Sequence, residues 1–175
     1  MDLIFELGVT SDIDELELLY NNLNDYLSMH TNYPGWIKGI YPTRKNATEG
    51  ISSKTLFVVR SEGKIAGSII LNHQPEEAYD DADWLVETTY DNIYVIRTFV
   101  VHPNFMGKGI GNALINYSIE FAKNSGIKTI RLDVYEKNIP AIKLYEKNGF
   151  IYTGTVDLGL GNYGLKWFRL YEKII

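Results

Sequence analysis

The chain has 175 residues, of which 45% are hydrophobic and 22% charged, so we predict one globular domain over residues 1–175. The absence of cysteine excludes disulfides, thiolate metal sites and a cysteine nucleophile, and no metal is expected. The net charge of −5 divides into −9 for residues 1–102 and +4 for residues 103–175, which argues against a nucleic-acid partner but is compatible with a small anionic ligand.

The N-terminal segment MDLIFELGVTSD is acidic, and its apolar run is too short for a secretory signal peptide. No window of the chain approaches the roughly 18 uncharged apolar residues that a membrane-spanning helix needs. We therefore expect a cytoplasmic protein with no membrane partner. The sequence leaves the oligomeric state open, including a homodimer.

Two helices are predicted in the first third of the chain. Ser11 is the expected N-cap of a helix that runs to about Leu27, and Thr43 that of a short helix through Gly50. The first helix is indicated by apolar residues at helical spacing: Ile13, Leu16, Leu19, Tyr20 and Leu23. TLFVVRS and KIAGSIILNH then form a predicted hairpin around Glu62-Gly63, and the polar stretch HQPEEAYDDADWLVE is expected to be a surface loop.

The second half of the chain alternates strands and helices. IYVIRTFVV is a predicted strand, followed by a helix over residues 112–125 that ends at Gly126, the strand TIRLDVY, and a short helix from Pro140 to Asn148. FIYTGTV and KWFRLYEKII are the closing strands. The strand–helix–strand order predicts a parallel pair with a right-handed crossover. The expected fold class is α/β (α+β), a mixed and mostly antiparallel sheet with one parallel, splayed βαβ pair and helices on both faces.

Three glycines stand where the strand IYVIRTFVV gives way to a helix, in the stretch HPNFMGKGIGNAL. A glycine-rich turn at a helix N-terminus directs backbone N–H groups at one point and is typical of an anion site. The P-loop pattern fails because Gly109, not Ser or Thr, follows Lys108. The GxGxxG fingerprint fails because position 112 is Asn.

The same stretch resembles the acyl-CoA pyrophosphate loop of the GNAT superfamily of N-acetyltransferases, Arg/Gln-x-x-Gly-x-Gly/Ala. Both glycine positions match, and Met106 stands where the family usually has Arg or Gln. NIPAIKLYEKNGF, residues 138–150, is similar to the family's downstream motif Asn-x-x-Ala-x-x-Leu-Tyr-Glu-Lys-x-Gly-Phe at each specified position. The resemblance covers residues 94–150 and otherwise only the order of elements.

The resemblance implies acetyl-CoA as co-substrate and assigns residues to it. The edge of the splayed strand, which would take the pantetheine arm, is Phe99, Val100 and Val101. The pyrophosphate cradle comprises Gly107, Lys108, Gly109, Ile110, Gly111 and Asn112. Asn138 has two readings, a helix N-cap and a polar contact to the coenzyme; the resemblance favours the second, and a side chain at a cap can do both.

Tyr145 is the expected general acid that protonates the departing thiolate, because a phenol with a pKa near 10 is neutral beside a thiol with a pKa near 8.5. The general base is open between Glu87 and Asp91, acting directly or through water. His102 has a suitable pKa, but it lies beside Pro103 and is expected to end the strand.

Trp36, Tyr41 and Trp84 are candidates for the acceptor pocket, with local packing as the alternative for each. An acidic run could attract a cationic amine or simply be solvated: Glu76, Glu77, Asp80, Asp81 and Asp83. The expected function is acetyl transfer to a primary amine of a small molecule by direct attack in a ternary complex. A peptide or protein amino group as acceptor, and an acyl-CoA sensor without turnover, stay open as alternatives.

Overall fold

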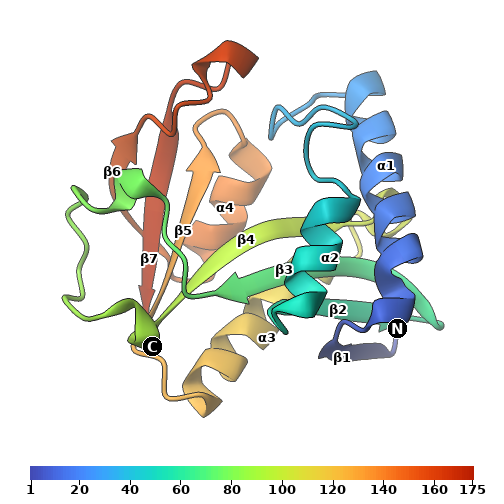
Figure 1. Ribbon diagram of the computed structural model, residues 1–175, viewed down its shortest axis with the longest axis horizontal. Coiled ribbons are helices and arrows are strands. Elements are labelled where there is room, and N and C mark those ends of the chain that lie inside the picture. The colour runs from blue at the N-terminus through green and yellow to red at the C-terminus, as the bar shows by residue number, and fades with distance from the viewer. The chain divides into compact units, whose positions relative to one another are not determined.

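The computed structural model describes residues 1–175 (Figure 1). Its four helices are α1 (Ile13–Met29), α2 (Arg44–Ser52), α3 (Ile110–Asn124) and α4 (Ile139–Lys147). The strands are β1 (Leu3–Leu7), β2 (Leu56–Ser61), β3 (Lys64–Asn72), β4 (Ile93–Val101), β5 (Thr129–Tyr135), β6 (Ile151–Val156) and β7 (Phe168–Ile174). No helix is both long and apolar enough to cross a membrane.

The seven strands form one sheet in the order β1-β2-β3-β4-β5-β7-β6. The β4–β5 pair is parallel, and the pairs β1–β2, β2–β3, β5–β7 and β6–β7 are antiparallel. The predicted fold class, a mixed and mostly antiparallel sheet with one parallel βαβ pair, is therefore confirmed. Contacts divide the chain into two compact units, residues 1–32, 36–71 and 97–114 in unit 1 and residues 33–35, 72–96 and 115–175 in unit 2. The expectation of a single domain stays a prediction.

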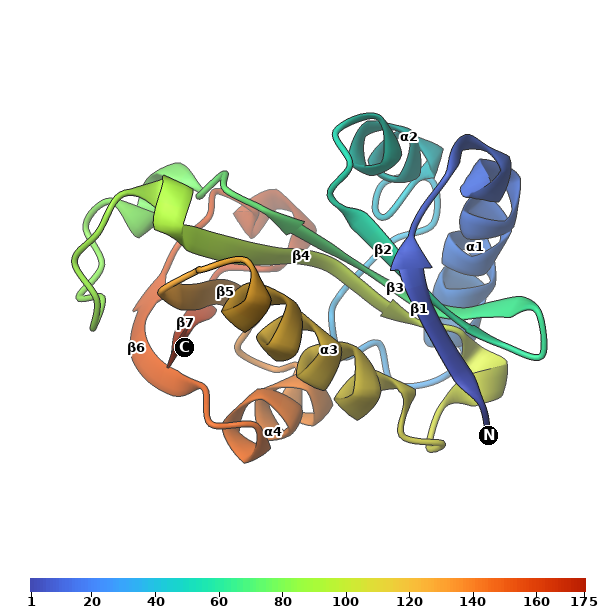
Figure 2. The same cartoon turned by 90° about the horizontal axis from the view of Figure 1, so that it is seen from below.

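In unit 1, α1 and α2 pack on β2 and β3 (Figures 1 and 2). The apolar stripe of α1 is buried as its spacing predicts: Leu16, Leu19, Tyr20, Leu23 and Leu27. α2 begins after Thr43, the predicted cap, which forms a capping box with Asn46: the Thr43 backbone N–H donates to Asn46 Oδ1 at 2.8 Å. Ser11 is not the cap of α1. It lies in a 3₁₀ turn, and Asp12 takes the cap position, where its carboxylate accepts from the Val9 N–H at 3.0 Å.

The edge strand β1 has no counterpart among the predicted elements. Its sequence LIFEL has apolar residues on both faces and only half-buried or exposed positions, so neither alternation nor a continuous buried run marks it. Pairing with β2 at five residue pairs, Leu3 with Ser61 through Leu7 with Phe57, is what makes it a strand. The two paired strands are far apart in the sequence, so the residues of β1 carry no local signal of the pairing.

In unit 2, β5 pairs with β7 over its full length, and α4 lies against this part of the sheet (Figure 2). Tyr145 of α4 packs near Tyr171 of β7, with ring centroids 6.5 Å apart. The expected surface loop of residues 73–87 is only partly that. Tyr79 is 1% exposed within a buried cluster with Val95 and Leu170. Because the segment is mostly polar, its composition did not indicate that two of its aromatic residues, Tyr79 and Trp84, pack against the sheet.

Gly67 of β3 tests how closely the chain packs in unit 1. A Cβ there would lie 2.7 Å from the carbonyl oxygen of Val100. Because this oxygen belongs to the backbone, it cannot easily move away from the added methyl group. We expect Gly67→Ala to lower the free energy of unfolding by about 1–3 kcal/mol. That loss corresponds to a few degrees in Tm, at roughly 2–4 °C per kcal/mol for a chain of this size.

The matched control is Gly161→Ala, because nothing lies within 4 Å of the added Cβ and the backbone there is not left-handed. Urea denaturation should show a change within about 0.5 kcal/mol for the control. Equal stability of the two variants would contradict the close approach at Gly67.

Candidate functional site

The glycine turn joins β4 to α3 through a short 3₁₀ turn, Pro103–Phe105. Gly107 and Gly109 have φ angles of 73° and 82°, in the left-handed region that favours glycine. No atom lies within 4 Å of the Cβ that either residue would carry in substituted form. The turn is therefore an open, exposed cradle of bare backbone that side chains at these two positions would fill.

α3 begins directly after this turn. Its first turn is closed by the Ala113 N–H donating to the Gly109 carbonyl at 3.0 Å. The N–H groups of Ile110 and Gly111 precede that bond and have no intrahelical acceptor. They lie at the positive end of the helix dipole, where a negative group is stabilised. The Lys108 ammonium lies 5.4 Å from the Phe105 ring centre and adds positive charge to the same turn.

These features fit the diphosphate of a coenzyme, because such a group needs backbone donors, positive potential and no intruding side chain. Met106, at the position where the similar loops have Arg or Gln, is 37% exposed and offers no charge or hydrogen-bond donor. The cradle therefore depends on the main chain and on Lys108.

His102 ends β4 as expected. Its Nδ1 accepts from the Asn104 N–H at 3.1 Å, which caps the 3₁₀ turn and leaves the neutral ring proton on Nε2. Burial lowers the pKa of His102 below its ordinary value, so the ring is neutral at pH 7. Its backbone N–H donates to the Ala66 carbonyl at 2.8 Å. The role of this residue is to terminate the strand.

The second half of β4 has an unusual backbone. Thr98 has a φ of 46°, a left-handed conformation that is rare for a β-branched residue and is often found at functional sites. Its Oγ1 lies 2.8 Å from the Tyr41 hydroxyl, and the Tyr41 ring meets Trp36 edge-on with ring centroids 5.3 Å apart. Two of the three candidate acceptor residues, Trp36 and Tyr41, are thus brought together in unit 1.

The three predicted edge residues of β4 differ in exposure. Val100 is 1% exposed and belongs to the core beneath α1, whereas Phe99 and Val101 are half-buried. The parallel pairing of β4 with β5 covers only three pairs, from Ile93 with Thr129 to Val95 with Arg131. Beyond these pairs, the rest of β5 pairs only with β7.

α4 carries the other two residues that the resemblance assigns. Asn138 is the N-cap, since its Oδ1 accepts from the Ala141 N–H at 3.5 Å, so the capping reading is confirmed. Tyr145 is 5% exposed, and its ring is held between Phe150 and Tyr171 at centroid distances of 5.7 Å and 6.5 Å. This packing fixes the direction of the phenol.

The segment before β4 is anchored by a buried ion pair. Arg131 of β5 and Glu172 of β7 are 5% and 0% exposed in their side chains, with Nε 3.1 Å from Oε1. Arg131 Nη2 also donates to the Val86 carbonyl at 2.6 Å, and the Leu85 N–H donates to the Glu172 carboxylate. Both charged groups therefore form hydrogen bonds with the backbone of the segment at Leu85 and Val86, and these bonds hold the segment in place.

The candidate bases belong to this segment. Glu87 follows Val86 directly, and Asp91 lies in a 3₁₀ turn just before β4; both are exposed. Arg131 and Glu172 lie on the opposite face of β5 and β7 from Tyr171, because side chains alternate along a strand. Glu87 therefore lies on the face of unit 2 opposite to the one that α4 covers.

Trp84 is occupied by packing. Its indole N–H donates to the Tyr79 carbonyl at 2.8 Å, and the Arg131 guanidinium lies 4.4 Å from its ring centre. Unlike Trp36 and Tyr41, it lies in unit 2.

Sequence reasoning missed four polar residues of these surroundings: Thr98, Arg131, Asp133 and Glu172. Asp133 accepts from the buried Tyr79 hydroxyl at 2.6 Å, on the same face of β5 as Arg131. A signal was present, because charged residues inside the apolar strands TIRLDVY and KWFRLYEKII need buried partners.

Comparison with known proteins gives one family. The model of the acetyltransferase (GNAT) family matches residues 17–150. An uncharacterized N-acetyltransferase of Methanocaldococcus jannaschii is 30% identical over 161 residues, 88% of this chain and 64% of that protein. Streptothricin acetyltransferase of Streptomyces lavendulae is 29% identical over 106 residues, 61% of this chain and 49% of that protein. The chain thus spans less than two thirds of each curated relative.

A solved structure gives the fold independently. A Salmonella typhimurium protein determined with its cofactor acetyl-CoA superposes with a TM-score of 0.72 at 16% identity, covering 99% of this chain and 94% of that one. At this identity the likeness concerns the fold.

The buried ion pair can be tested by removing one partner. We expect Arg131→Met to lower the free energy of unfolding by about 3–5 kcal/mol, because Glu172 is left as an unpaired buried charge. The double variant Arg131→Met with Glu172→Gln should recover part of that loss. Lys123→Met is the control, since its pair with Glu120 is exposed and is worth about 0.5 kcal/mol or less. A single-variant loss as small as the control's, measured in urea, would show that the pair does not hold the segment.

Proposed function

Because the chain belongs to the acetyltransferase (GNAT) family, we propose that it transfers the acetyl group of acetyl-CoA to a primary amine of a small molecule. The observation that carries the proposal is the open glycine cradle of Gly107 and Gly109 at the start of α3. A cradle without side chains, at the positive end of a helix, has the chemistry that the diphosphate of a coenzyme requires.

Binding is proposed for the main chain around the turn. The N–H groups at the start of α3 and the Lys108 ammonium bind the diphosphate, and the half-buried edge of β4 at Phe99 and Val101 binds the pantetheine arm as an added strand would. Asn138 caps α4 and so fixes the start of the helix that carries Tyr145.

The bound coenzyme supplies a thioester that an amine can attack directly. Tyr145 provides the proton for the departing sulfur, because a phenol ordinarily keeps its proton at pH 7 and the Tyr145 ring is fixed by Phe150 and Tyr171. Glu87 or Asp91, both exposed, removes the proton of the amine, through water where the carboxylate does not reach it.

A small cationic acceptor is supported by two observations. Exposed carboxylates cluster before β4: Glu77, Asp80, Asp81 and Asp83. They create a negative potential that attracts an ammonium group. The relative from Streptomyces lavendulae is named for acetylation of streptothricin. Trp36 and Tyr41 provide aromatic surface for such an acceptor, and Tyr41 is fixed by Thr98.

The test of the function is a thiol-release assay with acetyl-CoA and a panel of amines: streptothricin, polyamines, amino acids, aminoglycosides and peptides with a free amino group. Turnover with a small amine supports the proposal. Turnover confined to the peptides would show that the acceptor is a peptide or protein amino group and not a small-molecule amine. Coenzyme binding without turnover on the whole panel favours the sensor.

Substitution within the cradle should separate coenzyme binding from stability. We expect Gly109→Ala to weaken acetyl-CoA binding by about tenfold or more in calorimetry, because the added methyl group occupies the space of the diphosphate. Gly159→Ala is a control with a φ of 79° and equally open space, so both variants carry the same backbone strain. Similar losses of coenzyme affinity in both variants would show that the glycine cradle does not bind the coenzyme.

Tyr145→Phe keeps the ring and removes the proton donor. We expect kcat to fall by about 10²-fold or more, with the dissociation constant of acetyl-CoA nearly unchanged. Tyr94→Phe is the matched control, since its ring stacks on Phe121 at 5.8 Å and no role in catalysis is assigned to it. An unchanged kcat in Tyr145→Phe would disprove the acid role.

A further inference from the structure

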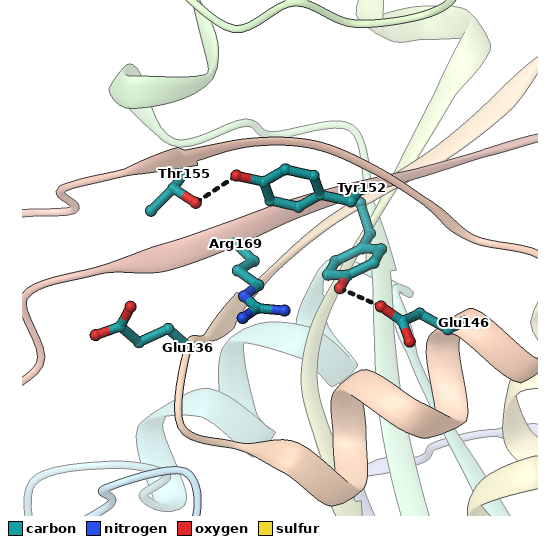
Figure 3. Close-up of a pocket in the computed structure, with 6 residues that line it drawn as sticks. Glu136, Glu146, Tyr152, Thr155 and Arg169 are labelled. Carbon is teal, nitrogen blue, oxygen red and sulfur yellow. Dashed lines mark hydrogen bonds between the residues drawn. The ribbon is translucent and has the colours of Figure 1, made fainter.

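Unit 2 contains a polar hollow that the proposed function does not use. It has a volume of about 430 Å³ and opens between α4 and the β6–β7 hairpin (Figure 3). Six residues line it: Glu136, Glu146, Tyr152, Thr155, Arg169 and Tyr171. None of them is assigned to the coenzyme or the acceptor, and the volume is within the range of small-molecule sites.

Three charged groups face this hollow without pairing with one another. The Arg169 guanidinium lies between the side chains of Glu136 and Glu146 (Figure 3). It is a hydrogen-bond partner of the Tyr171 hydroxyl, which uses only part of the five donors that a guanidinium carries. No ion pair joins it to either carboxylate. The three side chains start from different elements, Glu136 after β5, Glu146 on α4 and Arg169 on β7, so the backbone keeps the charges apart.

Two hydrogen bonds link residues that line the hollow. The Tyr171 hydroxyl donates to Glu146 Oε1 at 2.8 Å, and burial raises the pKa of Tyr171, so it stays a donor at neutral pH. The hydroxyl oxygens of Tyr152 and Thr155, both in β6, lie 2.7 Å apart on either side of an irregularity in this strand. The Tyr152 ring is 51% exposed and provides an apolar surface at the rim.

The order of the charges, negative, positive, negative, determines which ligand fits. We propose that the hollow binds a free basic α-amino acid of the lysine type, whose carboxylate pairs with Arg169, its α-ammonium with Glu136 and its side-chain cation with Glu146. The formal charge of −1 in the hollow is matched by the +1 of such a ligand. The carbon chain of the ligand packs on the Tyr152 ring.

Other ligand classes leave a charge unmatched. A diamine meets both carboxylates but brings no anion to Arg169. A dicarboxylate satisfies Arg169 and faces two like charges. A neutral amino acid leaves Glu146 with only the Tyr171 hydroxyl. Each mismatch leaves one charged group of the hollow without an oppositely charged group in the ligand, which lowers affinity relative to a ligand that matches all three charges.

The experiment is isothermal calorimetry on the full chain without acetyl-CoA, using L-lysine and three analogues that each lack one charge. Cadaverine lacks the carboxylate, 6-aminohexanoate lacks the α-ammonium, and L-norleucine lacks the side-chain cation. We expect each analogue to bind about tenfold or more weakly than L-lysine. Absence of L-lysine binding at millimolar concentration overturns the proposal, whatever the fate of the acetyltransferase assay.

Three variants assign each charge. Arg169→Gln should weaken L-lysine binding about tenfold or more and remove its advantage over cadaverine. Glu136→Gln should remove the advantage over 6-aminohexanoate, and Glu146→Gln the advantage over L-norleucine. Lys173→Gln, on the same strand but outside the hollow, should keep both affinity and selectivity.

Thermal unfolding of each variant establishes that it is folded before titration. If folded variants bind L-lysine as the unmodified chain does, the ligand lies elsewhere and the proposal is wrong. That outcome would leave the proposed acetyl transfer untouched, because the titration contains no acetyl-CoA.

Discussion

The arrangement of unit 2 depends on one buried ion pair, that of Arg131 and Glu172. Removing two charges from water is expensive, and the attraction between them offsets that cost only when every remaining donor and acceptor is also used. Here the Leu85 N–H and the Val86 carbonyl complete the set. The segment before β4 thus supplies hydrogen bonds that the buried ion pair needs. Its aromatic residues cover the ion pair instead of facing water.

The contrast with Arg169 shows what this requirement means. Arg131 and Arg169 lie on neighbouring strands and point to opposite faces of the sheet, since Arg131 pairs in register with Glu172 and Arg169 with Val134. One guanidinium is enclosed and fully matched by the fold. The other is half-buried between two carboxylates with which it does not pair, and it interacts with the Tyr171 hydroxyl. The same residue type thus serves folding on one face and, in the proposed lysine site, ligand recognition on the other.

What could be predicted from the sequence is what the chain decides locally. The cap at Thr43, the hairpin around Glu62-Gly63 and the glycine turn before α3 each rest on residues within a few positions, and all three appear in the structure. The start of α1 was wrong by one residue, because Ser11 and Asp12 are both good caps and tertiary contacts with Arg60 favour the carboxylate.

The failures involve partners far along the chain. The ion pair joins positions 41 residues apart, and the Tyr79 hydroxyl reaches Asp133 across 54. No periodicity within residues 73–92 signals that this polar segment covers the sheet. The candidate site divides in the same way: the glycine cradle is local and was identified, whereas the bond between Tyr41 and Thr98, 57 residues apart, was not.

The buried positions of β4 change phase along the strand. Ile93 and Val95 are buried at odd positions, whereas Ile96, Thr98 and Val100 are buried at even ones. The change falls where pairing with β5 ends, and Thr98 follows it with a left-handed backbone. Side-chain parity after this point sets the direction in which the chain enters the glycine turn. A one-residue insertion or deletion here would send each following side chain of the strand, up to the glycine turn, to the opposite face of the sheet.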